Sequence, residues 1–123
     1  MAIHTDLPIY KVAYDLLITT TSLVKNMPRD FKASIGAKLR DECVEIMVLI
    51  FRANSTRNKT PYLDNLIERV QVADLLFRVA RDSQSISIPQ YASAIKLTGA
   101  VGRQAGGWRN SQRSPDASVS RHQ

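Results

Sequence analysis

Residues 60–82 read TPYLDNLIERVQVADLLFRVARD, and this stretch decides the fold. Its apolar residues recur at intervals of three and four, which is the spacing of a helix and not of a strand. Thr60 followed by Pro61 signals a helix start, because the proline ring fits the first turn. The apolar residues fall on two faces: Leu63, Leu66, Ile67, Val70, Ala73 and Phe77 on one, and Val72, Leu75, Leu76 and Val79 on the other.

The same periodicity predicts three further helices, at about residues 8–26, 31–54 and 88–109. Asp30 has the side chain of an N-cap for the second of these helices. The turns between helices are short, and short connections make sequence neighbours antiparallel. We therefore expect an all-α, up-down-up-down antiparallel four-helix bundle over residues 1–109. Residues 110–123 are polar and lack periodicity, which predicts a disordered C-terminal tail.

The helix over residues 31–54 also has two apolar faces. One carries Ile35, Leu39, Cys43, Ile46, Ile50 and Ala53, and a nearly opposite one carries Val44, Met47, Val48 and Phe51. A single four-helix bundle lacks the material to cover both faces of two helices. We therefore expect a homo-oligomer whose interface contains Val44, Met47, Val48, Phe51, Val72, Leu75, Leu76 and Val79. The alternative is that both helices are simply well buried within the monomer.

The composition is that of an ordinary globular domain, with 44% hydrophobic and 23% charged residues. The single cysteine, Cys43, excludes an intrachain disulfide, and a free thiol on an apolar helix face fits a cytoplasmic location. The first residues have no signal-peptide pattern, and no apolar run approaches the roughly 20 residues of a membrane span, so no membrane partner is expected.

The chain has a net charge of +6, and the positive charge is concentrated in its last third. Residues 1–82 hold 12 Lys and Arg against 10 Asp and Glu, whereas residues 83–123 hold 5 against 1. Such an excess suits an anionic partner, above all a nucleic acid.

In an up-down bundle the loop between the second and third helices lies at the same end as both termini. That end gathers the candidate nucleic-acid-binding residues Arg52, Arg57, Lys59 and Arg109, and a fifth candidate, Arg103, lies about two helical turns in from it. The alternatives are a solvated basic end that only aids solubility, or contacts around Lys25, Arg29 and Lys32 at the opposite end. Trp108 has two possible roles: it packs in the core or at a subunit contact, or it stacks on a base.

The sequence carries no constellation that predicts catalysis, a metal site or a cofactor. His4 and His122 lie in the two terminal segments, and no Cys/His cluster has metal-ligand spacing. The carboxylates Asp41, Glu42 and Glu45 are expected to be structural, with Lys38 as a partner at helical spacing. Asp74 falls on the core side of its helix, so we expect an arginine beside it.

Several short motifs follow one another at consistent spacing. They are MPRDFK at 27–32, Ile35-Gly36, Lys38–Asp41, Glu45-Ile46, Ile50 with Ala53-Asn54, the Leu75–Asp82 stretch, Tyr91, and VGR with GGW over 101–108. Together they resemble the accessory variability determinant proteins of diversity-generating retroelements. The resemblance covers about residues 8–109. A related group, the four-helix proteins of ribosomal RNA intervening sequences, usually has a Ser-Ile-Pro-Ser-Asn stretch where this chain reads VEIMVLI, so the retroelement branch is favoured.

The resemblance implies a homopentameric barrel of four-helix bundles. It also implies that the protein binds the reverse transcriptase of the element and its template RNA or cDNA, and that it supports mutagenic cDNA synthesis without being an enzyme. The residues themselves point only to helices, self-association and a basic surface. The other readings are an intervening-sequence-type bundle that binds structured RNA, a structural oligomer with incidental charge, and a small helical enzyme.

Overall fold

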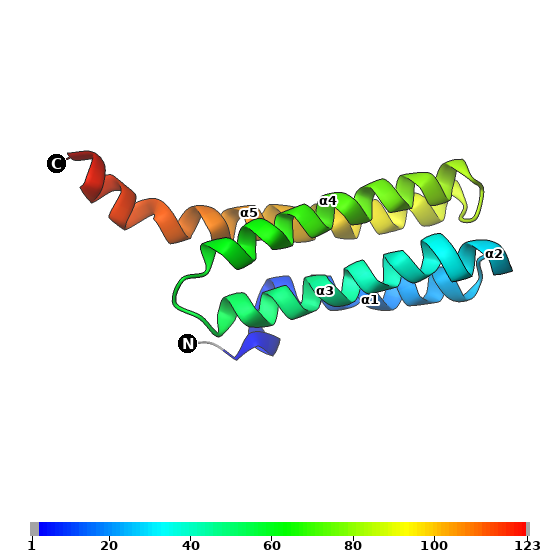
Figure 1. The fold of residues 1–123 in the computed structure, drawn as a ribbon, viewed down its shortest axis with the longest axis horizontal. Coiled ribbons are helices and arrows are strands. Elements are labelled where there is room, and N and C mark those ends of the chain that lie inside the picture. The colour runs from blue at the N-terminus through cyan, green and yellow to red at the C-terminus, as the bar shows by residue number, and fades with distance from the viewer. Residues whose placement is uncertain (1–2, 123) are drawn as a thin grey trace.

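The computed structural model describes the backbone of residues 3–122 and the side chains of residues 3 and 5–112. Across these residues it contains helices and no strand. The four long helices are α1 (Pro8–Lys25), α3 (Ala37–Asn54), α4 (Thr60–Asp82) and α5 (Ile88–His122). Each packs on two others, in the order α1–α3–α4–α5 and back to α1, and consecutive helices run in opposite directions (Figure 1). The predicted all-α four-helix architecture is confirmed.

The hydrophobic core runs along the axis shared by the four helices. Its largest fully buried side chains come from every helix and include Leu16, Leu39, Ile46, Leu63, Phe77 and Val101. Four of them, Leu39, Ile46, Leu63 and Phe77, belong to apolar faces identified from the spacing, and burying one such side chain stabilises the fold by about 1.5–3 kcal/mol. Proline occupies the first turn of α1 and of α4, as expected.

The second predicted helix is built from three consecutive segments. A short α2 (Arg29–Phe31) leads into the π-helical turn η2 (Lys32–Gly36), which continues directly into α3. The predicted N-cap at Asp30 is wrong, because Pro28 holds the cap position and Asp30 lies in the first turn. Gly36 is where this segment comes closest to α1. A Cβ on Gly36 would lie 2.9 Å from Val24 Cγ1 and 3.1 Å from Met27 Sδ, so the close approach depends on glycine.

The end of α5 differs from the prediction of a disordered tail over residues 110–123. The helix does not end at Arg109 but runs on to His122. Apolar periodicity reports which residues are buried, and it ends where α5 leaves the bundle. An existing helix can continue past that point, because adding a residue needs no new nucleus.

Candidate nucleic-acid interface and subunit contacts

The loop between α3 and α4, residues 55–59, lies at the same end of the bundle as the N-terminus and the later part of α5 (Figure 1). We call this the loop end. Of the predicted nucleic-acid-binding residues, Arg52, Arg57 and Arg103 are exposed. None of these three forms an ion pair with a described carboxylate. Their guanidinium groups are therefore available to an anion from outside.

Lys59 has a structural role that the sequence did not reveal. Its ammonium group donates hydrogen bonds to the carbonyl oxygens of Ala53, at 2.8 Å, and Thr56, at 2.7 Å. The side chain thereby satisfies carbonyl groups at and just beyond the C-terminus of α3, where a cation also meets the negative end of the helix dipole. Lys59 therefore shapes the loop that carries Arg57.

Arg109 is also engaged within the chain. Its Nε donates to an Oδ of Asp64, which ties the later part of α5 to the start of α4. Both side chains are partly exposed, so this pair contributes little to stability, about 0–1 kcal/mol. The charge of Arg109 is partly neutralised by Asp64, so its guanidinium is less available to an external anion than that of Arg103.

Within the carboxylate cluster on α3, Glu42 has an ion-pair partner on α4, and this partner is not the expected Lys38. Nη1 of Arg69 on α4 donates to both carboxylate oxygens of Glu42, at 3.0 and 3.2 Å. Arg69 reaches Glu42 because the two residues lie at the same level of the antiparallel α3–α4 pair. Among the described residues no group of three His, Cys, Asp or Glu side chains could hold a metal ion. The side chains of His4 and His122 lie outside the described residues.

The arginine expected beside Asp74 is not there. Asp74 Oδ1 is buried, and no described residue gives it a hydrogen bond. Arg78, four residues after Asp74 on α4, is exposed and forms no ion pair with it, and the other two arginines of α4 are used elsewhere. Arg69 binds Glu42 and Glu68, while Arg81 binds Asp82 and stacks over the Tyr91 ring at 4.4 Å. An unpartnered buried carboxylate oxygen costs stability.

Cys43 is a buried thiol within the core. Its Sγ donates a weak hydrogen bond to Thr20 Oγ1 at 3.3 Å. Burial raises the pKa of the thiol to about 11, because the thiolate would lose its hydration. At neutral pH Cys43 is therefore protonated and unreactive, which excludes it as a nucleophile.

The predicted second face of α3 is on the surface and continues onto α1. Phe51 is 50% exposed and Val44 is 45% exposed, while Met47 and Val48 are half-buried. Tyr10 of α1 lines a shallow depression with Met47, Val48 and Phe51, and its ring stacks on that of Tyr14. With exposed Ile18 one turn further, these residues form what we call the α1–α3 face. The α1 part was missed, although Tyr10, Tyr14 and Ile18 recur every four residues.

The predicted second face of α4 is a separate surface, which we call the α4 face. Leu75 is 55% exposed and Val79 is 38% exposed, while Val72 and Leu76 are half-buried. The Glu42–Arg69 pair shows at which level this face lies relative to the α1–α3 face, because α3 and α4 are antiparallel. Val44–Phe51 lies on the loop side of that pair, whereas Val72–Val79 lies on the opposite side. Each chain therefore presents two different apolar surfaces at different levels of the bundle.

Comparison with known protein families assigns this chain to one of them. A family model described as bAvd-like matches residues 9–112, which is most of the chain and includes all four helices. The chain belongs to the bAvd-like family. The predicted resemblance is thereby confirmed, and the family is one of accessory, non-catalytic proteins. Among curated proteins none matches the chain.

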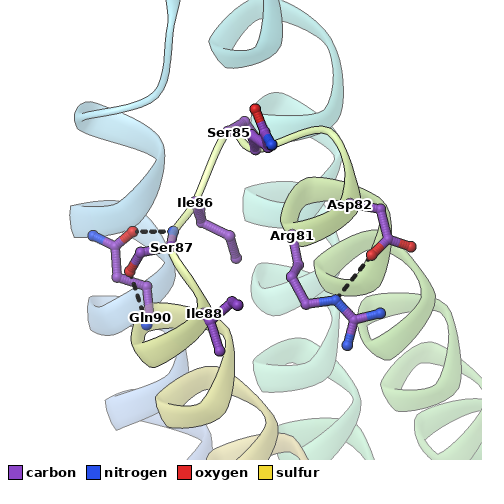
Figure 2. Close-up of a pocket in the computed structure, with 8 residues that line it drawn as sticks. Arg81, Asp82, Ser85, Ile86, Ser87, Ile88 and Gln90 are labelled. Atoms are coloured by element: carbon purple, nitrogen blue, oxygen red, sulfur yellow. Dashed lines mark hydrogen bonds and ion pairs between the residues drawn. The ribbon is translucent and has the colours of Figure 1, made fainter.

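The end of this bAvd-like bundle opposite the loop end has a hollow at the turn from α4 to α5, shown in Figure 2. Ser87 and Gln90 bond reciprocally there as a capping box, and Arg81 is held by Asp82. Gln84 turns the chain with φ of 62°, a left-handed conformation. The polar groups of the hollow thus close the turn. Lys25, Arg29 and Lys32 are also at this end and exposed.

In this family member no described helix is both long and apolar enough to cross a membrane. Its surface features are instead the exposed arginines of the loop end and the two apolar faces. Trp108 is half-buried and packs against the core, as the first of its two predicted roles requires. It also lines a groove between α1 and α5.

Proposed function

We propose that this protein is the accessory subunit of a diversity-generating retroelement. In this role it self-associates, binds the template RNA and the cDNA copied from it, and binds the reverse transcriptase of the element. It acts in the cytoplasm and supports mutagenic cDNA synthesis without catalysing it. Membership of the bAvd-like family supports the role as an accessory protein.

The observation that carries the nucleic-acid part is the charge of α5. From Ile88 to Gln112 this helix contains Lys96, Arg103 and Arg109 and no Asp or Glu. Arg52 and Arg57 add exposed cations at the loop end. A polyanion meets little repulsion there, and each phosphate contact releases counterions. Arg52, Arg57 and Arg103 are the main phosphate ligands in this proposal, and Lys59 and Arg109 support them.

The two apolar faces support self-association. The α1–α3 face and the α4 face differ in composition and in level, so pairing one with the other is a head-to-tail contact. Repeating such a contact closes a ring when a whole number of the rotations from one subunit to the next adds up to 360°. We propose the pentamer that the family resemblance implies, with Val48 and Leu76 at the contact. A ring repeats the loop end around its axis, so individually weak phosphate contacts act together.

The reverse transcriptase partner rests on the resemblance to the retroelement proteins. The experiment that tests the proposed function is reconstitution with the reverse transcriptase and template RNA encoded beside the gene of this protein. We expect the three components to co-purify, and we expect cDNA synthesis to require the accessory protein. The matched control replaces Arg52, Arg57 and Arg103 with Gln, which should remove RNA binding while the oligomer stays intact. Full cDNA synthesis without the protein would contradict the proposal.

A further inference from the structure

A groove at the loop end lies between the start of α1 and the later part of α5. Its cavity measures about 310 Å³, which is within the roughly 300–1,000 Å³ range of small-molecule sites. Leu7, Pro8 and Ile9 form one side, and Gln104, Gly107 and Trp108 form the other. Gln104 is the one polar side chain of this lining. The groove is therefore mostly apolar, with one aromatic wall and a single amide that can donate and accept hydrogen bonds.

Trp108 is held in place as a wall of this groove. The indole is half-buried and packs against the core, next to the buried Ile9. Its orientation is fixed by packing, so little side-chain entropy is lost when a flat ligand stacks on it. Gly107 borders open space, since a Cβ built on this lining residue would meet no atom within 4 Å. Glycine in a helix interior costs about 1 kcal/mol relative to alanine, and the packing of the bundle does not require it here.

The surroundings of the groove are basic. Arg103 precedes Gln104 and is exposed, and exposed Lys11 follows Pro8 by one helical turn. α5 supplies no carboxylate over its described side chains, and Asp6 is the acid nearest to Leu7 in the chain. Cations around an aromatic slot suit a ligand that is flat, apolar on its faces and attached to an anion. An unpaired base on a phosphate backbone has this chemistry.

We propose that this groove binds one unpaired nucleobase of a single-stranded nucleic acid. The base stacks on Trp108, Gln104 bonds to its edge, and Arg103 and Lys11 contact the flanking phosphates. This inference rests on the nucleic-acid binding proposed above and adds to it that the strand is unpaired at the contact. Paired bases are excluded, because their faces are already covered in the duplex.

Trp108 is the single tryptophan of the chain, so its fluorescence reports on this groove alone. The probe is a mixed-sequence single-stranded oligoribonucleotide of roughly 12 nucleotides, and the control is an abasic ribose-phosphate strand of the same length. We expect the oligoribonucleotide to quench Trp108 and to bind at least about ten-fold more tightly than the abasic strand. The abasic strand should bind without quenching.

Two variants test the groove while leaving Trp108 unchanged: one blocks the groove and the other leaves it open. Gly107→Leu places a side chain in the groove, whereas Gly106→Leu is a matched control whose Cβ also meets no atom within 4 Å and which does not line the groove. Both substitutions favour the helix, so neither should unfold the protein. We expect Gly107→Leu to abolish quenching and weaken binding about ten-fold, and Gly106→Leu to retain both.

The outcomes separate this inference from the function on which it rests. Equal binding of both strands without quenching would overturn the base site and leave phosphate binding standing. Binding of neither strand would overturn both. An equal response to a duplex of the same sequence would also overturn the base site.

Discussion

Lys59 donates a hydrogen bond from its ammonium group to the carbonyl oxygen of Ala53, 2.8 Å away, and this contact separates two basic residues that the sequence alone treats as equivalent. Lys59 stabilises the end of α3, whereas Arg57, two residues earlier, is exposed and forms no ion pair with a described carboxylate. The two residues should therefore respond differently to the same substitution.

Arg57→Gln should weaken RNA binding without changing stability. Each phosphate contact contributes about 0.7–0.9 to the slope of log affinity against log salt, so the slope should flatten by that amount for each subunit whose Arg57 contacts the RNA. Because phosphate contacts carry no sequence information, the loss should be similar for unrelated RNAs. The measurement is RNA affinity over a series of salt concentrations. An unchanged slope would move the phosphate contacts elsewhere, for example to Lys25, Arg29 and Lys32.

Lys59→Gln should instead lower the free energy of unfolding, because two carbonyl oxygens lose their donor. The expected loss is about 1–2 kcal/mol, since the contact is partly buried and the donor is charged. Thermal unfolding monitored by circular dichroism measures it, with Arg57→Gln as the control of equal charge change. If both variants unfold at the same temperature as the wild type, the Lys59 contacts contribute nothing to stability in solution.

Val48→Asp and Leu76→Asp should each dissociate the oligomer. Val48 lies in the α1–α3 face and Leu76 in the α4 face, and a charge in either would be desolvated at the contact. The control is Asn65→Asp, which adds the same charge at an exposed polar position of α4. Light scattering should give a multiple of 13.8 kDa for the wild type and the control, and a smaller particle for each variant. A wild type of only 13.8 kDa would refute self-association.

Asp74→Ala should stabilise the protein. It removes a carboxylate oxygen that is buried without a donor, and relief of that penalty is worth about 1–3 kcal/mol, less the packing lost with the side chain. Asp15→Ala, at an exposed position of α1, should change stability by less than about 0.5 kcal/mol. Urea unfolding measures both. A destabilised Asp74→Ala would mean that a cation from another copy reaches this carboxylate.

Stability should fall at high pH because of Cys43. Its pKa rises from 9.0 to about 11 on folding, so the folded state binds this proton more tightly than the unfolded chain. The resulting stabilisation is fully present below pH 9 and is lost as the pH rises towards about 11. Cys43→Ala should lack this part of the pH dependence, which amounts to roughly 2–3 kcal/mol. Urea unfolding of both proteins over this range is the test, and parallel curves would contradict it.

The sequence by itself determined the helices and their inner faces. Leu63, Leu66, Val70, Ala73 and Phe77 are buried as their spacing predicted, because burial on one side of a helix imposes a period of 3.6 residues on the chain. Helix starts at Pro8 and Pro61 were also readable, since proline restricts the backbone locally. The placing of Arg52 and Arg57 at one end followed from the up-down order alone, whereas Arg103 lies further along the bundle, where its neighbour Gly102 faces Val70.

Only the tertiary structure decided which side chains meet across helices. Glu42 pairs with Arg69 and not with Lys38, Arg109 pairs with Asp64, and Asp74 Oδ1 has no partner among the described residues. The groove beside Trp108 likewise depends on where α5 lies against α1. These relationships depend on the rotation and axial register of packed helices, which are set by the interlocking of many side chains at once. No short stretch of sequence encodes that register.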